Sequence, residues 1–388
     1  MSGAQESTTH PAQRIQYAFT EEQEQFRAAL RRFLDDKSPP SEVRRLMETE
    51  PGYDPAVWRQ MSQELALPAI HLPHQYGGSG FGMVELGIVM EELGRALLCA
   101  PYFSTAVMAA NAILNAGSEQ QKAALLPDIA SGEHLATLAV AELGGDWDPH
   151  AIQLRATPAG DGFLLDGVKS YVLDGHVSDL LIVAARTAEA ADGLGLFVLP
   201  ADTRGLTRRL LKSMDATRKI ARIDFKGAQA QLLGSVGAGA NALARTLDQA
   251  AIALANEMVG GAQKLLDSAV NYAKMRVQFG RPIGSFQAIK HKLADMLLDV
   301  ELARSTAYYA AQAAAVEDPE WPALACMAKA AASEAYLRTA IDCIQIHGGI
   351  GFTWDNDTHL WFKRAKSSEV FLGMPDYHRE LLMQRWRV

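Results

Sequence analysis

The spacing of the apolar residues changes twice along this chain of 388 residues, and that change constrains the possible folds most strongly. In the first third, Thr20 and Gln23 have the spacing of a capping box, which opens a helix. Apolar residues then recur at helical spacing through Phe26, Leu30 and Phe33. A further helical stretch follows a glycine-rich loop, and helical character continues to about residue 131. The first third is therefore predicted to be helical.

The middle of the chain has a different pattern, because its apolar segments from residue 136 to residue 234 are short and turn residues separate them. The turn at 158–162 lies between Leu154 and Phe163 and predicts a hairpin. Two apolar runs, 180–185 and 194–199, have the length of strands. This region is predicted to be rich in β-structure.

The last third returns to helical spacing and has the strongest periodicity of the chain. One helix face carries Ile289, Leu293, Met296, Val300, Ala303 and Ala307. Leu297 and Leu298 widen this apolar stripe, so we expect the helix to be covered on more than one side. A second helix, over about 322–346, is rich in alanine, and small side chains let helices approach closely in a bundle or at a subunit interface.

An order of helices, then strands, then helices predicts an α+β fold and disfavours the alternating units of a Rossmann sheet. We predict three domains from the change of pattern. They are an N-terminal helical domain over residues 15–135, a middle β domain over 136–234 and a C-terminal, four-helix-bundle-like domain over 235–388.

Charge and composition exclude several classes of function. A net charge of -8 argues against a nucleic-acid surface, which needs concentrated Lys and Arg. Three widely spaced cysteines without a CxxC pair predict neither disulfides nor a metal site and fit a reducing compartment. No apolar run reaches the roughly 20 residues of a membrane helix, and the polar opening Met1–Arg14 is unlike a secretory signal. We therefore expect a cytoplasmic protein without a membrane partner.

A short segment at the start of the last helical region has the chemistry of a cofactor contact. It reads Arg276-x-x-Phe279-Gly, and Gln287 follows. A guanidinium can pair with pyrophosphate oxygens, and an aromatic ring can pack against a cofactor. The structural alternatives are a surface cation for Arg276, a packing ring for Phe279 and a capping amide for Gln287.

A second segment contains Gln345 followed by the pair Gly348 and Gly349. Two glycines allow a backbone to approach a cofactor closely, although a glycine pair can also simply end a helix. Together with the helix–strand–helix order, the two segments resemble the acyl-CoA dehydrogenase family. The resemblance extends from about Phe19 to Arg379.

The resemblance implies an oxidoreductase that binds FAD and dehydrogenates an acyl-CoA thioester between its α and β carbons. It implies an electron-transfer flavoprotein as the electron acceptor. It also implies that six residues of this chain contact a flavin dinucleotide bound mainly by a neighbouring subunit. These are Arg276, Phe279, Gln287, Gln345, Gly348 and Gly349.

The chain departs from the family at the positions that carry the chemistry. The family's usual base is the Glu of Tyr-Glu-Gly-Thr, and this chain has Leu372 there. Some members place the Glu on the helix before the Arg-x-x-Phe-Gly segment, where this chain has Ala250. Three hydroxyl residues that line the family's flavin site are replaced by Ala141, Trp147 and Leu173. No catalytic residue is therefore assigned to this chain.

These losses fit one hypothesis, since some bacterial acyl-CoA dehydrogenases of steroid and bile-acid side-chain breakdown are heterotetramers of two related chains. This sequence resembles the base-lacking chain, which completes the flavin site of its partner, and Asp215-Ala-Thr-Arg218 is similar to that branch. Two alternatives remain open. One is a self-sufficient homotetramer with Asp248, Glu257 or Glu369 as a relocated base, and the other is a flavin-free scaffold subunit.

Overall fold

The computed structural model describes residues 18–188 and 193–387. Its first part is helical and contains α1 (Glu21–Lys37), α2 (Pro40–Met47), α3 (Pro55–Arg59), α4 (Met83–Ala96), α5 (Ala110–Ala116) and α6 (Glu119–Ala130). The Thr20 hydroxyl accepts a hydrogen bond from the Gln23 backbone N–H at 3.2 Å. The Gln23 side chain accepts one from the Thr20 N–H at 2.9 Å, so the predicted capping box is confirmed.

The middle part folds into a seven-stranded sheet. Its strands are β1 (Ala136–Ala139), β2 (Arg155–Ala159), β3 (Gly162–Leu173), β4 (Leu180–Arg186), β5 (Leu194–Pro200), β6 (Leu206–Leu211) and β7 (Ile220–Leu232). The order is β1-β4-β2-β3-β7-β5, with β6 beside β7. Because β5 pairs with both β4 and β7, the sheet closes on itself around an apolar interior. The predicted hairpin is confirmed, since β2 and β3 pair antiparallel with Ala159 opposite Gly162.

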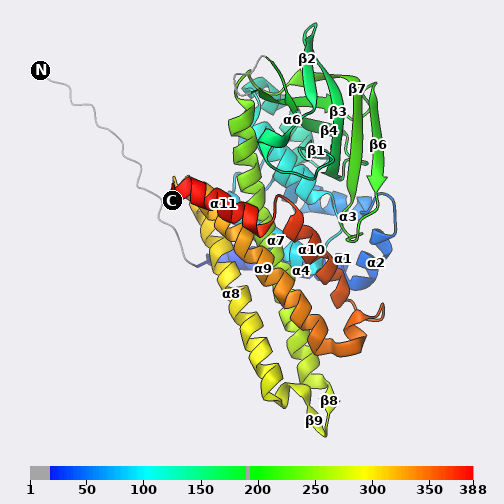
Figure 1. Cartoon of the computed structure of the whole chain (residues 1–388), viewed down its shortest axis with the longest axis vertical. Helices are drawn as coiled ribbons and strands as arrows, with labels where there is room; N and C mark the ends of the chain where they lie inside the picture. Colours follow the sequence, from blue (N-terminus) through cyan, green and yellow to red (C-terminus); the bar gives the residue numbers. More distant parts are fainter. Residues whose placement is uncertain (1–17, 189–192, 388) are drawn as a thin grey trace, which may run out of the picture.

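The last part is a bundle of long helices that extends away from the sheet (Figure 1). It contains α7 (Gly239–Met275), α8 (Gln287–Ala315), α9 (Trp321–His347), α10 (Thr358–Val370) and α11 (Pro375–Trp386). A small hairpin of β8 (Val277–Gln278) and β9 (Arg281–Pro282) joins α7 to α8 at the far tip of the molecule. The predicted α+β fold, with helices on both sides of a β-rich middle, is confirmed.

The outer face of α8 differs from the expectation. Met296, Val300, Ala303 and Ala307 are buried, as their spacing predicts. Leu297 and Leu298, however, are 49% and 58% exposed, so the described residues of this chain do not cover a second side of the helix. Among the described helices, none is both long enough and apolar enough to cross a membrane.

A close crossing of α4 and α7 sets the position of the site described below. A Cβ added at Gly260 would lie 1.8 Å from the Glu91 carbonyl oxygen, and one at Gly94 would lie 2.0 Å from the Glu257 carbonyl oxygen. Only glycine allows two helix backbones to pass so closely. The crossing therefore fixes Glu257 deep in the molecule, where α7 faces both the sheet and α10.

Candidate functional site

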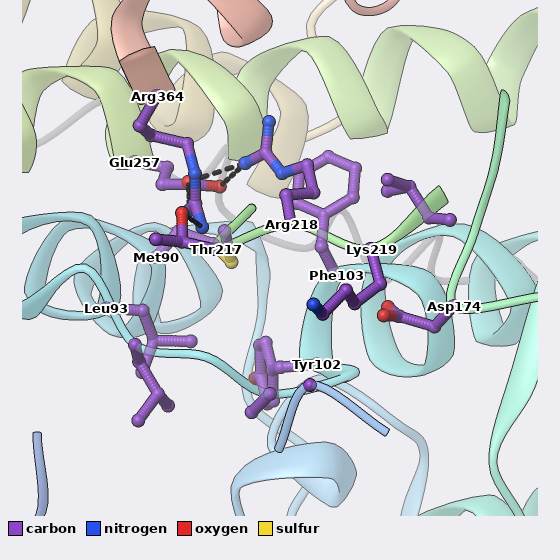
Figure 2. A pocket seen from close by; sticks show the side chains of 14 residues that line it. Met90, Leu93, Tyr102, Phe103, Asp174, Thr217, Arg218, Lys219, Glu257 and Arg364 are labelled. Atoms are coloured by element: carbon purple, nitrogen blue, oxygen red, sulfur yellow. Dashed lines mark hydrogen bonds and ion pairs between the residues drawn. The ribbon is translucent and has the colours of Figure 1, made fainter. Parts of the chain in front are cut away.

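Four charged residues meet where the sheet, α7 and α10 come together. Asp215 and Arg218 lie on the segment between β6 and β7, Glu257 lies on α7, and Arg364 lies on α10. Figure 2 shows the guanidinium groups of Arg218 and Arg364 beside the Glu257 carboxylate. All four side chains are nearly buried, with exposed fractions from 1% to 9%. We call these four residues the junction network.

The geometry of the junction network satisfies its charges internally. Arg218 Nη2 donates to both carboxylate oxygens of Glu257, at 2.6 and 2.8 Å. Arg364 Nη1 donates to Glu257 Oε1 at 2.7 Å, and Arg364 Nε donates to Asp215 Oδ2 at 2.9 Å. Two arginines and two carboxylates give the network no net charge. Glu257 is therefore a paired, buried carboxylate, and both of its oxygens are already hydrogen-bonded within the chain.

Burial and the neighbouring charges shift the pKa values of Asp215 and Arg364 in opposite directions. Burial alone would raise the pKa of Asp215, but the guanidinium groups of Arg364 and Arg218 outweigh it and hold that pKa below its ordinary value. Burial would lower the pKa of Arg364, and the carboxylates of Asp215 and Glu257 raise it instead. The ion pair between Asp215 and Arg364 is thus stabilised in its charged form. Asp174, close by, differs, since burial raises its pKa to about 6.

Two cavities border the network, and Arg218 and Leu173 line both of them. The first, shown in Figure 2, has a volume of only about 30 Å³. The second has a volume of about 260 Å³, and Trp147 and Phe371 also line it. Ligand sites range upward from roughly 300 Å³, so neither cavity fits a flavin ring together with an acyl thioester.

Aromatic rings complete the filling of this region. Phe371 makes edge contacts with Trp147 and Phe103, with ring centroids 4.9 and 5.7 Å apart. The Arg218 guanidinium carbon lies 5.5 Å from the Phe371 centroid and 5.9 Å from the Phe103 centroid. A Trp thus adds its ring where the family resemblance implies a small hydroxyl side chain. Trp147 and Phe371 therefore occupy part of the place where this resemblance implies a flavin ring.

The two positions at which the family carries its base are buried and apolar, since Leu372 is 3% and Ala250 is 0% exposed. Leu372 and Asp248 both line a cavity of about 400 Å³. Both oxygens of Asp248 accept hydrogen bonds from Arg385 Nη2, each at 2.9 Å. Burial raises the pKa of Asp248 to about 6 although Arg385 opposes this. Glu369, the third carboxylate considered, pairs with Lys366.

The predicted flavin contacts lie elsewhere, at the far tip of the bundle. Arg276 follows the last residue of α7 and is exposed. Phe279 and Gly280 form the two-residue turn of the β8–β9 hairpin, with φ of 55° and 76°. Phe279 is 90% exposed, and a side chain other than Gly or Asn is uncommon in this left-handed region. The Phe279 ring makes an edge contact with the Phe286 ring, with centroids 6.1 Å apart, and is otherwise open to solvent.

The second predicted segment lies beside the end of α7. The His347 ring stacks on the Tyr272 ring with centroids 4.3 Å apart, which brings the end of α9 against the end of α7. Gly348 follows with a φ of 67°, and a Cβ added at Gly348 or Gly349 would meet open space. Gln345 is exposed on the last turn of α9. Gln287 is exposed at the start of α8, where its Nε2 lies 3.2 Å from His291 Nε2.

The tip and the junction are separate places in the molecule. From residue 257 to residue 276 the chain follows α7, which is about 28 Å at the rise of an α-helix. Arg276 is therefore too distant to contact a dinucleotide whose ring lies at this chain's own junction. The described residues of this chain leave the side chains of the tip exposed.

Comparison with known proteins agrees with the fold and this domain order. The chain matches the N-terminal, middle and C-terminal domains of acyl-CoA dehydrogenases over residues 20–133, 137–227 and 237–386. It therefore belongs to the acyl-CoA dehydrogenase family, whose members are FAD-dependent oxidoreductases.

Its similar relatives include a mycobacterial acyl-CoA dehydrogenase and a solved structure whose name describes a steroid enzyme. It is 33% identical to "Acyl-CoA dehydrogenase IpdE2" of Mycolicibacterium smegmatis, with 92% of this chain and 96% of that protein covered. The structure of a variant of the "Tcur3481-Tcur3483 steroid ACAD" is 31% identical, with a TM-score of 0.85 and 95% and 98% of the two chains covered. The ChsE4-ChsE5 complex from Mycobacterium tuberculosis is 26% identical, with a TM-score of 0.87 and 96% and 99% covered.

Sequence reasoning missed the junction network as a unit. The sequence indicates Asp215 and Arg218 only through the family likeness, and it offers Glu257 only as an alternative base. No pattern in the sequence singles out Arg364, which lies on the helix that leads to Leu372. The available signal is confined to Glu257, which is the one carboxylate in a run of apolar and small residues over 250–262.

Proposed function

We propose that this chain is a subunit of a flavin-dependent acyl-CoA dehydrogenase and that it completes the FAD site of a related catalytic chain. The observation that carries the proposal is the distance between the exposed tip of the bundle and the junction network. The residues suited to hold a dinucleotide are exposed at the tip, about 28 Å along α7 from a junction whose two cavities measure about 30 and 260 Å³. A chain that held its own flavin and substrate would need space at that junction.

In this proposal the tip binds and orients, and the partner chain does the proton chemistry. Arg276 pairs with the pyrophosphate, Phe279 packs its exposed ring on the dinucleotide, and the Gly348–Gly349 backbone approaches it closely. Gln287 and Gln345 supply amide hydrogen bonds. FAD, when bound, supplies the hydride-accepting chemistry at the β carbon. A carboxylate of the partner takes the α-proton, and an electron-transfer flavoprotein receives the electrons.

The likeness to steroid-type proteins supports an acyl-CoA substrate of the steroid side-chain class. It also supports a hetero-oligomer, because the ChsE4-ChsE5 neighbour is a complex of two chains. The acyl group itself lies against the partner's residues in this arrangement. This chain therefore contributes to cofactor affinity more than to substrate choice.

The test is a flavin titration of the complex with Arg276→Ala. A charge-assisted hydrogen bond is worth roughly 1.5–3 kcal/mol, so flavin affinity should fall about ten- to a hundredfold. Arg276→Lys should rescue only part of this loss, because an ammonium lacks the planar fork of a guanidinium. Arg281→Ala is the matched control, since Arg281 is an exposed cation of the same hairpin that stacks on Phe286 at 4.1 Å. Equal affinities for Arg276→Ala and the unchanged complex would contradict the proposal.

The second candidate is a self-sufficient enzyme with a relocated base. The specific observation in its favour is Asp248, which shares a cavity with Leu372 and has a pKa raised to about 6. Against it, Arg385 holds both oxygens of Asp248. Asp248→Asn distinguishes the two. Loss of turnover in the chain purified alone would support the second candidate, whereas turnover absent before the change supports the first.

The third candidate, a flavin-free scaffold subunit, makes a different prediction for the same complex. It requires that the flavin content of the complex be unchanged by any substitution in this chain's tip. The Arg276→Ala titration therefore separates it from the first candidate as well.

A further inference from the structure

We propose that the junction network is a built-in plug, which closes this chain's own flavin and acyl site independently of the missing base. The inference rests on the proposed function in one respect, since it takes the junction as the place of that unused site. Its central residue is Arg218, which stands between the two cavities and lines both.

The contacts of Arg218 fix its side chain in this position. Its Nη2 donates to both oxygens of Glu257, and its Nη1 donates to Ser368 Oγ at 3.1 Å. The rings of Phe103 and Phe371 lie beside the guanidinium. A side chain held by a carboxylate, a hydroxyl and two rings cannot swing aside without breaking several interactions at once. The partition between the cavities is thus rigid.

The volumes of the two cavities indicate that the Arg218 side chain excludes a ligand of the size of a flavin ring. The cavities of about 30 and 260 Å³ are each below the roughly 300 Å³ of a small ligand site. Joined through the space of the Arg218 side chain, they would pass that size. The joined space would be lined by Trp147, Leu173 and Phe371, which present the apolar and aromatic surface that a planar ring needs.

Stability alone does not account for four buried charges at this place. Buried ion pairs seldom add net stability over well-packed apolar residues of the same volume, because desolvation offsets their attraction. The network is neutral by itself, so it needs no flavin, substrate or ion to balance it. It also connects the segment before β7 to α7 and α10, the same elements that would otherwise enclose a ligand.

The test compares two double variants of the full chain that carry the same charge and differ in volume. Arg218→Ala/Glu257→Gln removes one cation and one anion and opens the partition. Arg218→Met/Glu257→Gln makes the same change of charge and keeps the space filled. The probe is riboflavin, which carries the ring without the adenine half, and binding is followed by quenching of its fluorescence.

The opened variant should bind riboflavin at least about tenfold more tightly than the filled variant and the unchanged chain. Equal binding by the opened and filled variants, or equally tight binding by the unchanged chain, would overturn the inference. Arg218→Ser/Glu257→Gln is a second opened variant for the same comparison. A rise in melting temperature with riboflavin, confined to the opened variants, is the second measurement.

The outcome is distinguishable from the fate of the proposed function. Arg276 lies about 28 Å along α7 from the network, so its variants report on cofactor binding at the tip. If the opened variants do not bind riboflavin, the inference about the junction network is wrong, and the result of the Arg276 titration is unaffected. If Arg276→Ala leaves flavin affinity unchanged, the proposed role of the tip is wrong even if the opened variants bind riboflavin.

Discussion

Arg364→Met should be among the most destabilising single substitutions in this protein. The side chain donates to Glu257 at 2.7 Å, to Asp215 at 2.9 Å and to Thr217 Oγ1 at 2.7 Å. Methionine fills much of the same volume but leaves Asp215 buried without its cation. Glu257 keeps Arg218. The network changes from neutral to a net charge of minus one, and the Asp215 side chain that loses its cation is 1% exposed.

The magnitude follows from that uncompensated charge. Removing one partner of a buried ion pair costs about 3–5 kcal/mol, since the remaining charge is left desolvated and unpaired. Arg364→Met/Asp215→Asn restores neutrality, so the double variant should lose only about 1–2 kcal/mol, from weakened hydrogen bonds. The second substitution should thus recover stability that the first removes, and the two changes should be strongly non-additive.

The assay is urea unfolding of the chain followed by circular dichroism and tryptophan fluorescence. The control is Arg222→Met, which removes an Arg from a partly exposed pair with Asp224 on β7 and should change the free energy of unfolding by less than about 1 kcal/mol. A loss below about 1 kcal/mol for Arg364→Met would refute the reasoning. So would a double variant that is less stable than the single one.

Two further predictions follow from the base position and from a buried lysine. Leu372→Glu should produce no dehydrogenation of acyl-CoA in the isolated chain, because a carboxylate can act as a base only when the substrate and the flavin ring are held in the correct positions. Measurable turnover by this variant would show that the site is open. Lys329 donates to Ser333 Oγ and to the carbonyls of Glu369 and Gly373, and burial lowers its pKa from 10.5 to about 7. Since the unfolded chain binds this proton more tightly, the free energy of unfolding should rise between about pH 7 and pH 10.5, and Lys329→Met should remove that slope. An unchanged slope in the variant would assign the pH dependence to other groups.

The parts of the fold that depend on local signals could be predicted from the sequence. The capping box of α1 and the β2–β3 hairpin involve residues close together in the chain, so spacing and turn chemistry sufficed. The exposure of Leu297 and Leu298 could not be predicted, because helical periodicity indicates an apolar stripe but not what covers it.

The junction network lay beyond sequence reasoning for a physical reason. Arg218 and Glu257 are 39 residues apart, Glu257 and Arg364 are 107 apart, and Asp215 and Arg364 are 149 apart. No periodicity connects such positions, and only the packing of α7 and α10 against the sheet brings them together. The tip residues can be identified from the sequence as candidate flavin contacts, since each lies in a short segment with a recognisable spacing. Their role as flavin contacts stays a prediction.

The central claim, that this chain completes a partner's flavin site and holds none of its own, is tested most directly by counting flavin per chain. The chain is purified alone and also after co-expression with a related acyl-CoA dehydrogenase chain that carries the catalytic Glu. We predict little or no flavin in the chain alone, and one flavin for each pair of chains in an active complex. A homo-oligomer of this chain that carries one flavin per chain and oxidises an acyl-CoA would contradict the account.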